Sequence, residues 1–116
     1  MPPVIERVSY MSDRVQHVVL FKFPQALSSE EEKEMFEHVR SWRQHIKGLS
    51  GLRFGKDETG RSSGFDYLLV TQFDNEEDHQ SYYSQEAHVA FGKWVRDRNC
   101  ELIRVDYRLT PETLLI

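Results

Sequence analysis

The stretch over residues 15–23 is the sequence feature that most constrains the fold. Its side chains alternate between two faces of an extended strand. One face would carry His17, Val19, Phe21 and Phe23, and the other would carry Val18, Leu20 and Lys22. Because both faces are largely apolar, we expect both to be covered, and Pro24 should end the strand.

The remaining periodicities give the order of the elements. Ser28 and Ser29, followed by Glu31 and Glu32, form two overlapping capping boxes that begin a helix. Apolar residues then recur at helical spacing to about residue 46, with Gly48 as the C-cap. Further patterns predict strands over 49–56 and 65–73, a short helix from Asn75 to about Tyr83, a helix capped by Ser84 over about 85–98, and a strand over 102–108. This order is that of the α+β, ferredoxin-like βαββαβ fold.

The length of 116 residues predicts one domain. We expect an N-terminal extension over 1–14, a domain over 15–108 and a C-terminal tail over 109–116. Two helices should cover one face of a four-stranded antiparallel sheet. The opposite face would carry Val18, Leu20, Leu68, Val70, Ile103, Val105 and Tyr107. That face is too apolar to be left in water, which predicts a homodimer formed through it.

Composition excludes several classes of protein. The net charge is −4 without a basic stripe, so we expect no nucleic-acid partner. The single cysteine, Cys100, excludes an internal disulfide and fits a reducing compartment. No apolar run is long enough to span or enter a membrane, and no signal peptide is recognisable, so a cytoplasmic protein is expected. His17, His88 and Asp106 lack a recognised metal-site spacing, and no Walker or dinucleotide motif occurs, so neither a metal nor a cofactor is expected.

Candidate chemistry centres on His88, which lies about one turn into the last predicted helix and six residues after Tyr82. A neutral imidazole can accept a proton near pH 7, and a phenol can donate to a developing oxyanion. Strand parity places Asp106 on the helix-covered face, where its carboxylate could orient the imidazole. Both side chains could instead be packing residues. Tyr83 would replace Tyr82 if the helix phase shifted by one residue.

Four segments resemble the family of stress-responsive dimeric α/β barrel domains. They are residues 17–23 (HVVLFKF), 55–57 (GKD), 87–92 (AHVAFG) and 105–107 (VDY). The chain is similar in particular to its polyketide cyclases, of the olivetolic acid cyclase type, which close a linear polyketide thioester by an intramolecular aldol condensation. The resemblance implies that His88 is the catalytic histidine, that Tyr82 is the catalytic tyrosine and that Asp106 supports the histidine.

The resemblance also implies a substrate cavity. Its walls would be His17, Val19, Phe21, Met35, Phe36, Val39, Leu69, Phe91 and Leu102. From the residues alone, Met35, Phe36 and Val39 are most simply explained as a core stripe, and His17 is equally well explained as a core residue. Arg104 replaces an apolar wall residue of the cyclase. It would either pair with Asp106 or a helix glutamate, which we expect first, or bind a substrate carboxylate. His38, His45 and His79 are expected on helix surfaces without a role.

These observations predict a small cofactor-independent enzyme that acts on a small carbonyl substrate. The expected reaction is a polyketide-cyclase-like, intramolecular aldol-type cyclisation by acid/base catalysis, or a related lyase or isomerase step. Two alternatives remain: a non-catalytic stress-responsive barrel protein and a cofactor-free monooxygenase. An open pocket lined by His88, Tyr82 and His17 would favour an enzyme, whereas side chains that fill this space would favour the non-catalytic alternative.

Overall fold

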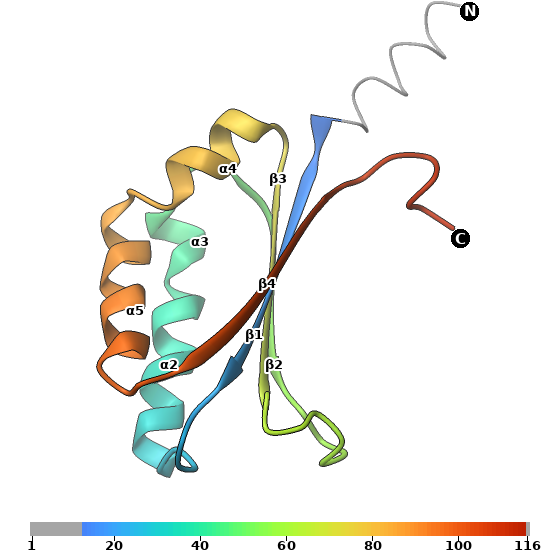
Figure 1. Cartoon of the computed structure of the whole chain (residues 1–116). Helices are drawn as coiled ribbons and strands as arrows, with labels where there is room; N and C mark the ends of the chain where they lie inside the picture. The colour runs from blue at the N-terminus through green and yellow to red at the C-terminus, as the bar shows by residue number, and fades with distance from the viewer. Residues whose placement is uncertain (1–12, 116) are drawn as a thin grey trace, which may run out of the picture.

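A computed structural model describes residues 13–115 as one antiparallel sheet with helices on one side (Figure 1). In chain order the elements are β1 (Val15–Lys22), α2 (Ser29–Arg40), α3 (Trp42–His45), β2 (Leu49–Lys56), β3 (Tyr67–Phe73), α4 (Glu76–Tyr82), α5 (Glu86–Arg96) and β4 (Glu101–Arg108). The strands lie in the order β2-β3-β1-β4. This confirms the predicted ferredoxin-like fold. Most of the predicted N-terminal extension lies outside the described residues.

The alternation of β1 decides which side chains face the helices. Val15, His17, Val19 and Phe21 are buried, and the residues between them are only partly buried. Strand β1 pairs with both β3 and β4. One row across the sheet is Thr71, His17 and Asp106, and the next is Leu69, Val19 and Arg104. These helix-facing rows form the floor on which the site is built.

The predicted helix over residues 29–46 is two helices in the structure. Helix α2 ends at Arg40 and α3 begins at Trp42. Between them, the Ser41 hydroxyl donates to the His38 carbonyl at 2.8 Å. Serine competes with the helical backbone in this way, which accounts for an interruption at this position. The interruption leaves Trp42 fully buried in the core.

Helix α5 begins one residue later than the sequence suggested. Gln85, not Ser84, occupies its N-cap position, and no side chain caps the helix. The Gln85 side chain instead bonds the loop after α3: Oε1 accepts from the Lys47 N–H at 2.8 Å, and Nε2 donates to the Lys47 carbonyl at 3.0 Å. This link fixes the start of α5, where His88 lies, relative to the rest of the helix layer.

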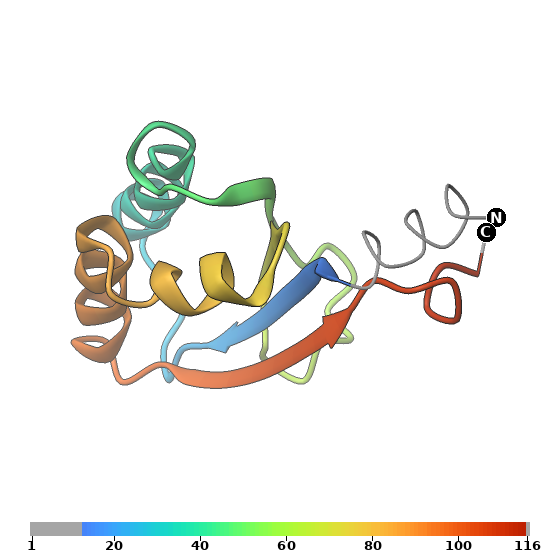
Figure 2. The same cartoon turned by 90° about the horizontal axis from the view of Figure 1, so that it is seen from above.

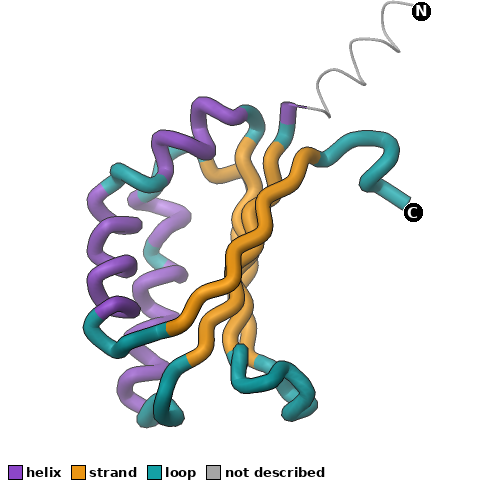
Figure 3. Tube along the Cα trace, in the orientation of Figure 1, coloured by secondary structure: helices purple, strands orange, loops and turns teal. Residues whose placement is uncertain are grey.

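Within residues 13–115, the second face of the sheet carries no helix (Figures 1 and 3). Leu68 is 40 %, Ile103 42 %, Val105 54 % and Tyr107 39 % exposed on this open face. Strand β4 forms one edge of the sheet beside β1 (Figure 2). No helix in the described part of the chain is long and apolar enough to cross a membrane.

Candidate active site

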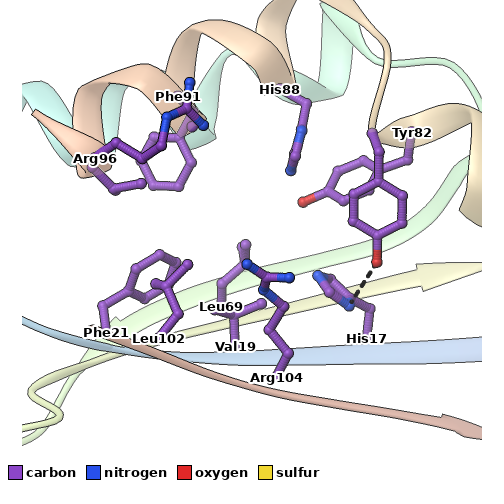
Figure 4. A pocket seen from close by; sticks show the side chains of 13 residues that line it. His17, Val19, Phe21, Leu69, Tyr82, His88, Phe91, Arg96, Leu102 and Arg104 are labelled. Atoms are coloured by element: carbon purple, nitrogen blue, oxygen red, sulfur yellow. Dashed lines mark hydrogen bonds between the residues drawn. The ribbon is translucent and has the colours of Figure 1, made fainter. Parts of the chain in front are cut away.

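A pocket of about 190 Å³ lies between α5 and the helix-facing side of the sheet (Figure 4). Its lining residues are His17, Val19, Phe21, Leu69, Tyr82, Tyr83, His88, Phe91, Gly92, Val95, Arg96, Leu102 and Arg104. Strands supply the floor, α5 supplies the roof, and the end of α4 closes one side. Arg96 and Arg104 are exposed, so the pocket reaches the surface beside them.

His88 and Tyr82 lie side by side at the inner end of the pocket, with ring centroids 4.2 Å apart. Asn75 caps α4 by accepting from the Asp78 N–H at 2.8 Å, and this start sets the helix phase that turns Tyr82 inward. Tyr82 is 0 % exposed. Its Oη and the Nδ1 of His88 are both buried, and neither makes a well-aligned hydrogen bond within the described residues, although the Thr71 side chain lies near Tyr82 and the Tyr83 backbone near His88. Buried polar atoms without a partner are rare in folded proteins.

The surroundings of His88 favour its neutral form. Burial lowers the pKa of His88 from 6.5, and the positive charges of Arg104 and Arg96 lower it further. The nearby backbone of Tyr83 acts in the opposite direction. Burial raises the pKa of Tyr82 above its usual value, so the phenol keeps its proton. The pair therefore offers a proton acceptor and a proton donor to the same space.

Asp106 supports His17 rather than His88, which corrects the expectation from the sequence. Its Oδ1 bonds the His17 Nδ1, because the two residues face each other across β1 and β4. Burial lowers the pKa of His17 below 6.5, although the Asp106 carboxylate opposes this shift. A carboxylate on Nδ1 leaves Nε2 of the neutral imidazole as a proton acceptor. His17 is thus a second histidine of the pocket.

His79 is buried, contrary to the prediction of a helix-surface position, and is 4 % exposed. Its Nδ1 lies 3.2 Å from Glu76 Oε1, and its Nε2 lies 2.9 Å from the Tyr83 hydroxyl. The Tyr83 hydroxyl also lies 3.4 Å from the His17 Nδ1 (Figure 4). Because the carboxylate can only accept, His79 Nδ1 donates, and in the neutral ring Nε2 then accepts from Tyr83. A hydrogen-bonded chain therefore runs along the edge of the pocket.

Three residues of this hydrogen-bonded network could hold a metal ion. His17, His79 and Asp106 bring ligand atoms within 4.8 Å of one another. The set considered from the sequence, from which no metal site was expected, had His88 in place of His79. Two imidazoles and a carboxylate suit zinc or another transition metal. However, hydrogen bonds already join these atoms, and the Tyr83 hydroxyl contacts both imidazoles. An ion would have to replace those bonds.

Several expected wall residues do not line the pocket. Met35 and Val39 are 0 % and 2 % exposed, and they belong to the core beneath α2, with Phe36 packed against it. Arg104 lines the pocket but makes no ion pair among residues 13–115, so the expected pairing with Asp106 or a helix glutamate is not formed. That expectation assumed a buried guanidinium, whereas Arg104 is exposed.

The model of the stress-responsive A/B barrel domain, Dabb, matches residues 15–109 of the chain. The chain belongs to this family. A comparison with curated proteins found no match. Among solved structures, this Dabb domain is similar to the hydroxynitrile lyase of Passiflora edulis, with a TM-score of 0.75 and 15 % identity over 86 % of this chain and 96 % of that chain.

Two other structural neighbours are described as dimeric proteins of unknown function with a ferredoxin-like fold. The one from Bacteroides fragilis has a TM-score of 0.71 and 26 % identity, over 85 % of this chain and 99 % of that chain. The one from Thermobifida fusca has a TM-score of 0.76 and 17 % identity, over 86 % and 94 %. These likenesses agree with the fold of the Dabb domain, and they leave its chemistry to be argued from the pocket.

Three residues of the pocket were not predicted from the sequence, Gly92, Val95 and Arg96, and Tyr83 was considered only as an alternative to Tyr82. Helical spacing could have found most of them, because His88, Gly92, Val95 and Arg96 recur at intervals of three and four. The same spacing relates His79 to Tyr82 and Tyr83. Charges beside His79 in the sequence had indicated a surface position, but helix phase was the better signal.

Proposed function

We propose that this Dabb domain is a small acid/base enzyme that transfers protons at a carbon next to a carbonyl group. The reaction would be an intramolecular aldol-type cyclisation of the polyketide-cyclase kind, or the reverse lyase step. The observation that supports this most is the close packing of His88 and Tyr82, whose ring centroids lie 4.2 Å apart among the residues that line the pocket. A base and a hydrogen-bond donor would thus act on the same part of a bound substrate.

In this mechanism the neutral His88 removes a proton from the carbon next to a carbonyl. The electron pair of the broken C–H bond moves onto the carbonyl oxygen, and Tyr82 donates a hydrogen bond to the resulting enolate. The enolate carbon attacks a second carbonyl of the same molecule and forms the new C–C bond. The proton on His88 then neutralises the alkoxide. The apolar floor would hold the flexible substrate in the reactive conformer.

His17 would be the second proton-transfer group of the pocket. Its Nδ1 is held by Asp106, and its ring is 2 % exposed, so its orientation is fixed. His17 and His88 enter the pocket from the sheet and from α5, respectively (Figure 4). A substrate between them could lose a proton to either neutral imidazole, and the imidazolium formed in this way could return that proton in a later step. This arrangement supports catalysis over the non-catalytic alternative.

The neighbour from Passiflora edulis is a hydroxynitrile lyase. At 15 % identity it says nothing about the substrate of this chain. It is nevertheless an enzyme on the same fold, which supports the proposal that such a helix–sheet pocket can be catalytic.

We also propose that the Dabb domain forms a homodimer through its open sheet face. Three exposed apolar side chains of β4, at positions 103, 105 and 107, continue the apolar surface of Leu68. Covering such a patch is favourable, at roughly 25 cal/mol for each Å² of apolar surface removed from water. The neighbours from Bacteroides fragilis and Thermobifida fusca are described as dimeric.

Proton exchange on simple ketones tests the proposed chemistry. Phenylpyruvate and its methyl ester serve as probes, and 1H NMR in D2O follows the loss of protons next to the ketone. The wild-type protein should accelerate exchange above the buffer rate. His88→Gln should lower the catalysed rate by about 10² to 10⁴, the usual contribution of a general base. Since the pKa of His88 lies below 6.5, the catalysed rate should be level near pH 7 and fall as the pH drops below that pKa.

His45→Gln is the matched control, because His45 is exposed on α3 outside the pocket. It should exchange protons as fast as the wild type. Equal exchange rates for His88→Gln and the wild type would show that His88 is not the base. A wild-type protein that accelerates exchange of neither probe would favour the non-catalytic alternative.

A further inference from the structure

Two arginines line the pocket from opposite sides. Arg96 comes from α5 and Arg104 from β4 (Figure 4). In Figure 4 the Arg104 side chain rises from its strand toward the space beneath His88. Arg96 folds back along α5: a Cβ at Gly92 would lie 3.1 Å from its Nη1, so the glycine leaves room for the guanidinium. Both cations therefore stand at the open end of the pocket.

Neither arginine forms an ion pair with a carboxylate within residues 13–115. The acidic groups close to them in sequence are engaged elsewhere. Asp106 bonds His17, and Asp97 accepts from Lys93 at 2.9 Å. By contrast, Arg98 on the outer side of the molecule is paired, with its Nε 2.9 Å from Glu31. Two guanidinium groups without an ion pair among residues 13–115 therefore line the same pocket, one on each side.

The positive charge acts on the interior of the pocket. No aspartate or glutamate is among the residues that line it. The charge of Arg104 adds to the burial that lowers the pKa values of His17 and His88, and it opposes the burial that raises the pKa of Tyr83, so its field reaches these three side chains. An anion in the pocket would therefore be attracted to its open end, while the apolar side chains of the floor would accept an uncharged body.

We propose that the substrate carries a carboxylate, and that Arg96 and Arg104 bind this carboxylate between them. The assignment rests on the proposed function, because it orients the same substrate. Guanidinium forks match carboxylates in shape and can bind them through two parallel hydrogen bonds. The carboxylate at the mouth would direct the rest of the molecule inward, so that its ketone approaches His88 and Tyr82. The substrate class is then a small keto acid with an apolar chain or ring.

Binding of a matched acid and ester tests the proposal. Phenylpyruvate carries the carboxylate, and methyl phenylpyruvate lacks the charge but keeps the ring and the ketone. Isothermal titration of the wild-type protein should show the acid binding at least ten times more tightly than the ester. Arg96→Gln and Arg104→Gln should each weaken binding of the acid by about ten-fold or more, since hydrogen bonds between charged groups are among the stronger ones in proteins. Binding of the ester should not change.

Arg40→Gln is the control, because Arg40 is exposed on α2 and lines no part of this pocket. It should leave both affinities unchanged. Inorganic phosphate serves as a further competitor. If phosphate competed at concentrations where acetate has no effect, the group bound by the arginines would be a phosphate and not a carboxylate, and the assignment would be overturned. Equal affinity for acid and ester in the wild type would also overturn it.

The same titrations on His88→Gln separate this assignment from the proposed function. Binding requires no catalysis, so the acid should keep its advantage over the ester in that variant. If the wild-type protein bound the acid more tightly than the ester but catalysed no exchange, the result would support the carboxylate site and contradict the proposed enzymatic activity. Failure of both probes to bind would count against both proposals.

Discussion

Tyr82 and Tyr83 are adjacent in the sequence, yet their hydroxyl groups have different partners. The Tyr82 hydroxyl is buried without a hydrogen bond, whereas the Tyr83 hydroxyl bonds His79 and lies near His17. Tyr82→Phe should therefore lower catalysed exchange by about 10², as loss of an oxyanion donor does, with little change in stability. Tyr83→Phe should instead cost about 1 to 3 kcal/mol of stability, because it leaves a buried acceptor on His79 unpaired.

Urea unfolding and the exchange assay on the two variants check this separation. Each is the other's control, since both lose one hydroxyl and keep the ring. If Tyr83→Phe lost activity at full stability while Tyr82→Phe remained active, the two tyrosines would have to exchange roles. The sequence left that choice open, because it depends on a helix phase known only to within one residue.

Residue partners were the least predictable part of the site. Strand parity alone placed Asp106 on the helix-facing side, as the structure has it. Parity does not give the register between β1 and β4, which are far apart in the chain. That register sets His17, and not His88, opposite Asp106. Local patterns thus determined which face a side chain takes, while its partner was decided by pairing between distant segments.

Individual elements were more predictable, because their signals are local. The N-terminus of α2 shows where such signals become ambiguous. Two capping boxes overlap in the sequence, and the structure forms the first: Ser28 Oγ accepts from the Glu31 N–H at 3.1 Å, and Glu31 Oε1 accepts from the Ser28 N–H at 3.0 Å. Glu32 is engaged elsewhere, 2.7 Å from the Lys56 ammonium, and it accepts from the Tyr67 hydroxyl at 2.6 Å. Tertiary contacts therefore choose between two equivalent local patterns.

This choice predicts different effects for two neighbouring serines. Ser28→Ala should lower the free energy of unfolding by about 1 kcal/mol, the usual cost of losing an N-cap. Ser29→Ala, at the first helical position, should change it by no more than a few tenths of a kcal/mol, because alanine is a good helix former there. Chemical denaturation of both variants measures the difference. Equal destabilisation would mean that both boxes contribute in solution.

At the scale of the whole molecule, the apolar open face of the sheet is the feature that residues 13–115 leave uncovered. Strand parity predicted seven residues on this face; four are exposed in the structure, Leu68, Ile103, Val105 and Tyr107, and three are partly buried, Val18, Leu20 and Val70. We argue what covers the face from the patch and from the dimeric neighbours. A second copy of the chain presents the same apolar face, which suits a two-fold interface.

Val105→Glu should therefore convert the dimer into monomers, because it would bury a carboxylate from each chain in the interface without a partner. Val105 is 54 % exposed in the single chain, so the substitution should leave the fold of each chain intact. Val89→Glu is the matched control: Val89 is 49 % exposed and lies on α5, away from the open face. Light scattering at micromolar concentration should give a dimer mass for the wild type and Val89→Glu, and a monomer mass for Val105→Glu. A wild type that is a well-folded monomer would contradict the proposed homodimer. A Val105→Glu protein that stays dimeric would move the interface to another face of the molecule.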